Sequence, residues 1–172
     1  MRKANFSAAV FLLLSIPVLL LAQKPEKPDQ LYQQGAALAL SGKINEAIPV
    51  FEKVVTMSPY WSLAHYALGK AYLASGVPEN IAKGLVSLKL AADLDKHSAD
   101  AWFYLGMAYY LKQDYPRAIS SYYQAYTIDD TNIAALYNIG AMYDLMGHSP
   151  KALLFFKRYY DAKKIEEEYY NF

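Results

Sequence analysis

Apolar residues recur every three or four positions along most of the chain after residue 28, a spacing typical of helices with one buried face. The stretch 99–132 contains two predicted helices with one apolar face each: Trp102, Leu105, Gly106 and Tyr109, then Ala118, Tyr122 and Ala125. Polar residues 112–115 followed by Pro116 predict a turn between them, because proline fits the first turn of a helix. The stretch therefore predicts a helical hairpin.

Small residues at regular spacing predict that this hairpin recurs. A glycine stands in the middle of each predicted first helix, with steps of 34, 37 and 34 residues: Gly35, Gly69, Gly106 and Gly140. The small residue of each second helix recurs with steps of 37, 34 and 34: Ala47, Gly84, Ala118 and Ala152. One three-residue insertion, predicted in the loop at 77–79, explains both longer steps. Two independent columns thus predict four hairpins.

Large residues flank the small ones in two further columns: Leu38, Tyr72, Tyr109 and Tyr143 in the first helices, and Phe51, Leu88, Tyr122 and Phe156 in the second. Because one hairpin cannot bury both of its faces, successive hairpins must stack. We expect repeats at about 28–61, 62–98, 99–132 and 133–166, followed by a C-terminal tail at 167–172.

The hairpin at 99–132 resembles the tetratricopeptide repeat, a helical hairpin with a period of 34 residues. The family pattern is matched by Trp102, Leu105–Gly106, Tyr109 and Ala118, while Tyr122 stands where the family has Phe and Asp130 where it has Pro. The resemblance implies an all-α, right-handed α-solenoid of about four helix-turn-helix repeats. It also implies that the first helices line a concave groove.

Carried over residue by residue, the resemblance places an aromatic column in this groove: Tyr32, Tyr66, Phe103 and Tyr137. Further groove positions hold Lys70, Tyr104, Met107, Tyr110 and Asn138. An aromatic strip of this kind would suit an extended apolar or Pro-rich peptide. Alternatively, these side chains pack between repeats, the array is a spacer, or the groove binds the chain's own C-terminal tail. Lys70 and Asn138 are the polar donors at these positions, which argues against a carboxylate clamp.

The N-terminal segment has the pattern of an export signal. Arg2 and Lys3 precede an apolar run, and Ala22 is a small residue at which a signal peptidase could cut. The alternative is an uncleaved inner-membrane anchor at 4–23, since about 20 uncharged residues can span a bilayer. We expect a signal peptide or anchor at 1–22, a linker at 23–28 and a periplasmic or secreted repeat array.

Composition excludes several kinds of chemistry. The chain has no cysteine, which excludes disulfides, thiolate metal sites and thiol catalysis. A formal net charge of +1 gives no electrostatic case for nucleic acid. The histidines His65, His97 and His148 lack the spacing of metal ligands on one helix face. We therefore predict no catalytic residues, no metal and no cofactor.

The leading hypothesis is a non-catalytic protein–protein interaction scaffold in the cell envelope or secreted, which binds an extended partner segment in the aromatic groove. The alternative is a glycan-binding or assembly-adaptor protein of envelope polysaccharide or secretion machinery, with tyrosines stacking on sugar rings. The third is an enzyme, for which no nucleophile, base or metal site can be named. Beyond the N-terminal segment, no membrane contact is expected.

Overall fold

The computed structural model describes residues 26–170. Within that range the chain forms eight helices and no strand: α1 Pro28–Leu40, α2 Ile44–Met57, α3 Ser62–Ala74, α4 Pro78–Leu94, α5 Ala99–Leu111, α6 Tyr115–Ile128, α7 Ala134–Leu145 and α8 Ser149–Tyr170. The predicted all-α fold is confirmed. The predicted signal peptide or anchor at 1–22, residues 23–25 of the predicted linker and the last two residues lie outside the described range.

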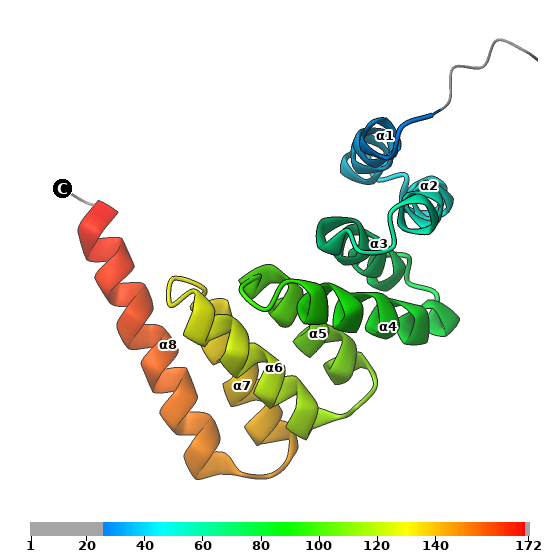
Figure 1. The fold of residues 1–172 in the computed structure, drawn as a ribbon. Coiled ribbons are helices and arrows are strands. Elements are labelled where there is room, and N and C mark those ends of the chain that lie inside the picture. The colour runs from blue at the N-terminus through cyan, green and yellow to red at the C-terminus, as the bar shows by residue number, and fades with distance from the viewer. Residues whose placement is uncertain (1–25, 171–172) are drawn as a thin grey trace, which may run out of the picture.

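Consecutive helices pack as four hairpins, and the second helix of each hairpin packs against the first helix of the next. The first helices also contact one another, α1 with α3 and α3 with α5. Figure 1 shows the result as an arc of stacked hairpins, with α1 at one end and α8 at the other. This is the solenoid that the repeated columns predict.

The glycine column makes room for the large residue of the facing helix. A methyl group at Gly35 would lie 2.8 Å from Cε1 of Phe51, and one at Gly69 would lie 2.5 Å from Cγ of Leu88. Phe51 and Leu88 are buried, and both belong to the column of large residues in the second helices. The glycines therefore accommodate whole side chains, and the helices do not merely approach backbone to backbone.

The three-residue insertion lengthens a helix. Helix α4 has 17 residues, whereas α2 and α6 have 14 each. The three extra residues lie at the start of α4, which begins at Pro78. Proline and Glu79 both suit a first helical turn, and Asn80 Nδ2 donates to Ser75 Oγ at 2.9 Å to tie that turn to α3. The predicted loop insertion at 77–79 was thus wrong, because its residues favour a helix start.

Each hairpin turns through a residue with a left-handed backbone. Gly42, Gly76 and Gly147 have φ between 68° and 78°, and Gln113 has φ 59° at the equivalent turn of the third hairpin. Glycine adopts this conformation without strain, whereas glutamine does not. Within residues 26–170, no helix is both long enough and apolar enough to cross a membrane.

Candidate functional site

A hollow of about 320 Å³ lies between α1 and α3. Alanines at 36, 67 and 71 contribute much of its lining, and since their side chains end at Cβ they leave the space open. The rings of Tyr32 and Tyr66 also line it, together with Phe51 from α2. The hollow is therefore apolar, and its size is that of a small ligand pocket.

Lys70 is the positively charged residue of this pocket. Its Nζ lies 4.9 Å from the ring centroid of Tyr104 and 5.4 Å from that of Tyr66, within the range of a cation–π contact. The two rings meet edge to face at 5.6 Å. None of the ion pairs found in the described residues includes Lys70. Its ammonium is thus held by rings, and no carboxylate pairs with it in the described residues.

The phenol of Tyr66 is kept in its protonated form. Burial raises the pKa of Tyr66 well above the ordinary value, and the nearby Asp100, Tyr104 and Tyr32 add to this effect by repelling a phenolate. Burial also raises the pKa of Tyr32. Both hydroxyl groups therefore remain hydrogen-bond donors at neutral pH.

The predicted aromatic column divides into separate groups of ring contacts. Tyr32 contacts Phe51 and Trp61 at 5.9 and 5.0 Å, Phe103 contacts Tyr104 and Tyr122 at 5.8 and 5.3 Å, and Tyr137 contacts Phe156 and Tyr159 at 5.3 and 5.4 Å. The Tyr66–Tyr104 pair joins α3 to α5. None of the ring contacts found among the described residues joins one member of the column to another.

These contacts mean that internal packing covers part of the surface of each ring. Tyr32, Tyr66, Phe103 and Tyr104 are half-buried, whereas Tyr137 is 46 % exposed. Met107 and Asn138 are half-buried and Tyr110 is 41 % exposed, and none of these three lines the α1–α3 pocket. The structure thus brings Tyr32, Tyr66 and Lys70 together at one pocket, with Tyr104 beside them. The binding role of all nine residues stays a prediction.

Sequence analysis missed the alanines of α3 that help to form the pocket: Ala67, Ala71 and Ala74. The signal was present, because alanines at i, i+4 and i+7 share one face of a helix. At the matching positions of α5, 37 residues further on, stand Tyr104, Ala108 and Leu111, so two of the three positions hold a larger residue there. A helix face of alanines beside the larger Tyr32 and Tyr66 therefore indicates a hollow.

His65 serves the fold. It is buried in α3, and its Nε2 donates to the carbonyl oxygen of Pro59 at 2.8 Å. This bond fixes the turn between α2 and α3. Among the described residues, no three His, Asp or Glu side chains lie close enough together to hold a metal ion.

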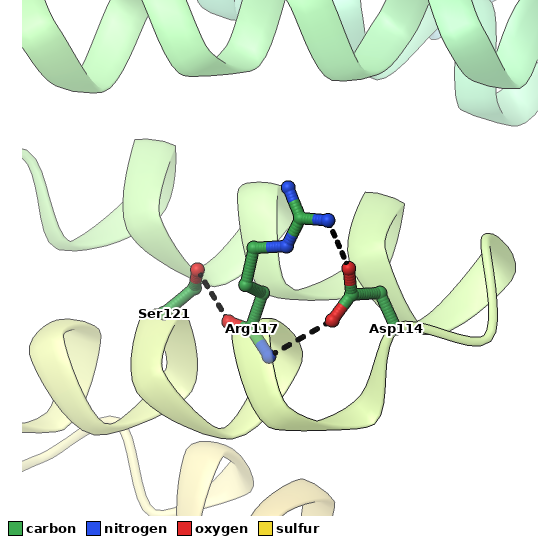
Figure 2. A network of polar contacts seen from close by, with 3 residues as sticks. All are labelled: Asp114, Arg117 and Ser121. Atoms are coloured by element: carbon green, nitrogen blue, oxygen red, sulfur yellow. Dashed lines mark hydrogen bonds and ion pairs between the residues drawn. The ribbon is translucent and has the colours of Figure 1, made fainter.

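The third hairpin contains a second polar arrangement, at the start of α6. Asp114 caps this helix by accepting from the backbone N–H of Arg117 at 3.3 Å, and its carboxylate pairs with the Arg117 guanidinium at 2.5 Å (Figure 2). Ser121 Oγ donates to the Arg117 carbonyl at 2.9 Å. The guanidinium also lies 5.0 Å from the Tyr109 ring centroid. These contacts are internal to one hairpin and stabilise it.

Comparisons with known proteins agree with this architecture. Tetratricopeptide repeat family models match residues 31–60 and 87–133. A crystal structure of MamA is 25% identical, with a TM-score of 0.79, over 87% of this chain and 86% of that one. MamA from Desulfovibrio magneticus RS-1 is also 25% identical, with a TM-score of 0.75, over 80% of this chain and 76% of that one.

A third solved structure is the first tetratricopeptide repeat domain of Spaghetti (RPAP3) bound to an HSP90 peptide. It is 21% identical with a TM-score of 0.66, over 70% of this chain and 94% of that one. No curated protein matches the chain in sequence. The repeated columns, the four stacked hairpins and both family matches show that the chain belongs to the tetratricopeptide repeat family.

Proposed function

We propose that the chain is a non-catalytic scaffold that binds an extended segment of a partner protein along the face formed by its first helices. The single observation that carries this proposal is the apolar hollow between α1 and α3. The fold supports an interaction role in general, since stacked helical hairpins present extended concave surfaces. The likeness to a repeat domain that holds a peptide supports it as well.

We infer the chemistry of the ligand from the residues that line the pocket. Its alanines and tyrosine rings fit one aliphatic or aromatic side chain of the bound segment. Lys70 would attract an acidic residue next to that anchor, because its ammonium makes no ion pair within the described structure. The phenols of Tyr32 and Tyr66 would donate hydrogen bonds to the peptide backbone. The favoured partner segment is therefore an apolar anchor flanked by an acidic residue.

Filling the pocket tests this proposal without truncating the core. Ala74 is exposed and lines the pocket, so Ala74→Phe should occupy the space meant for the anchor. Peptides would first be selected on the full chain from a random display library and then measured by fluorescence anisotropy. Ala74→Phe should weaken their binding by about tenfold or more, the effect of losing one buried apolar contact.

The matched control is Ala82→Phe, a similar exposed alanine on α4 that does not line the pocket. It should leave peptide affinity unchanged. Lys70→Glu should weaken the binding of peptides that carry an acidic residue and leave the binding of peptides without one unchanged. Equal binding to Ala74→Phe and Ala82→Phe, or no selectable peptide, would overturn the proposal.

The location of the scaffold is a separate part of the proposal. We propose that residues 1–22 direct the repeat array out of the cytoplasm, on the basis of the basic start, the apolar run and Ala22. Cell fractionation and N-terminal sequencing of the exported protein test it, with a new N-terminus at Gln23 as the expected result. Recovery of the array with the cytoplasmic proteins would contradict it.

A further inference from the structure

Helix α8 exposes apolar side chains at positions that are packed against a following helix in α6, the second helix of the preceding hairpin. Leu153 and Tyr160 stand 34 residues after Ile119 and Tyr126 of α6, both of which pack half-buried on a core cluster shared with α7. In α8 the side chain of Leu153 is 71 % exposed and that of Tyr160 is 61 % exposed. Leu154 and Ile165 are exposed nearby. The outer face of α8 therefore lacks the cover that α7 gives to α6.

This face is long and continuous. Helix α8 has 22 residues, whereas α7, against which it packs, has 12. Figure 1 shows α8 along the edge of the array, with no other helix on its far side. Residues 153, 157, 160, 161 and 164 follow the three- and four-residue steps of one helix face. The face thus mixes apolar residues with Lys157, Asp161 and Lys164.

The charges of α8 are ordered along its length. The first half contains basic Lys151, Lys157 and Arg158 and no acidic residue. The second half is acidic on balance, with Asp161 and the run Glu166–Glu168 against Lys163 and Lys164. This order opposes the helix dipole, which favours acidic side chains at the N-terminus and basic ones at the C-terminus. Lys163 pairs with Glu167 at 4.0 Å and Lys164 with Glu168 at 3.7 Å, but exposed pairs of this kind contribute little, so the stability of α8 alone does not explain the charge order. It is complementary to a copy of itself that runs in the opposite direction.

We propose that α8 pairs antiparallel with α8 of a second copy of this chain, about a two-fold axis. One register fits both the charges and the apolar residues. It places Lys157 opposite the second copy's Asp161, and it places Leu153 level with the second copy's Ile165. Because a two-fold interface is self-complementary, each of these contacts forms twice. A parallel pair would instead set basic halves against basic halves.

A charge exchange tests the register. Dimerisation of the full chain would be measured by analytical ultracentrifugation. Lys157→Asp and Asp161→Lys should each raise the dimer dissociation constant about tenfold or more, because each opposes like charges twice. The combined variant should restore the dimer. Lys89→Asp on α4 is the matched control and should have no effect. A monomer at every concentration, or a dimer indifferent to both single changes, would overturn the proposal.

Cysteine crosslinking tests the direction. The chain has no cysteine, so introduced thiols report only on their own contacts. In the proposed register Leu154 lies level with the second copy's Lys164. A mixture of Leu154→Cys and Lys164→Cys chains should form disulfides between unlike chains. Neither variant should crosslink alone, since like positions are about 15 Å apart along the axis and a disulfide needs Cα atoms within about 7 Å. Crosslinking of Leu154→Cys alone would indicate a parallel pair and overturn the proposal.

Discussion

Gly106 of α5 lies directly against the ring of Tyr122 in α6. A methyl group on Gly106 would be 2.8 Å from Cδ1 and 2.9 Å from Cε1 of that ring. Tyr122 is itself 2 % exposed and stands in the core shared with α7. The ring therefore has little room to retreat, and the contact joins the two helices of the third hairpin to the fourth.

We predict that Gly106→Ala destabilises the protein by about 1–3 kcal/mol, because the added methyl overpacks this contact. Urea denaturation followed by circular dichroism measures the change. In a Tyr122→Val background the space opens, and the same substitution should become neutral or stabilising by about 1 kcal/mol through the higher helix propensity of alanine. An equal loss in both backgrounds would show that the ring is not responsible.

We predict that Gln113→Gly stabilises the protein by about 1 kcal/mol. Gln113 has φ 59°, whereas the three equivalent turns have glycine. Glycine would remove the strain of a side chain in the left-handed region while keeping the backbone bond from Gln113 N–H to the Tyr110 carbonyl. Thermal melting measures the gain. Gly147→Gln is the reverse experiment and should lower stability by a similar amount.

We predict that Asp114→Ala destabilises α6 by about 1 kcal/mol, since it removes the N-cap of that helix. Asp114→Asn should cost less, because its amide oxygen can still accept from the backbone N–H of Arg117 while the ion pair is lost. Chemical denaturation of the two variants separates the cap from the ion pair. Equal losses would assign the whole effect to the ion pair with Arg117.

We predict that stability falls at alkaline pH through buried tyrosines. Burial raises the pKa of Tyr122 and that of Tyr66 above the ordinary value of 10.0. The pKa of Tyr72 is raised by burial and by its hydrogen bond to Glu52. Above pH 10 the unfolded phenols ionise while the folded ones do not. The contribution is thus fully present below pH 10 and is lost as pH rises from there through the raised pKa values.

Denaturation at a series of pH values between about 8 and about 12 measures this loss. Tyr122→Phe provides the control, because phenylalanine keeps the ring and has no group to ionise. The variant should show a shallower fall in unfolding free energy above pH 10. A curve parallel to that of the unmodified protein would exclude Tyr122 as a source of the effect.

Local patterns in the chain were enough to predict the repeating hairpin. The column from Gly35 to Gly140 and the matching column from Ala47 to Ala152 record which face of each helix meets its partner. They predicted the all-α solenoid, and the contact of Gly106 with Tyr122 shows why the small residues recur. This could be predicted because helix periodicity is a local property that reports burial directly.

The site depended on distances between hairpins, which no local pattern reports. The column Tyr32, Tyr66, Phe103 and Tyr137 stays a prediction as a binding groove, and each ring except Tyr66 contacts rings of its own hairpin or the adjoining turn. The hollow lies between α1 and α3, where alanines of both helices line the space beside Tyr32 and Tyr66. Periodicity thus determined which residues share a face, whereas the spacing of neighbouring helices in the folded array determined which of those faces enclose a pocket.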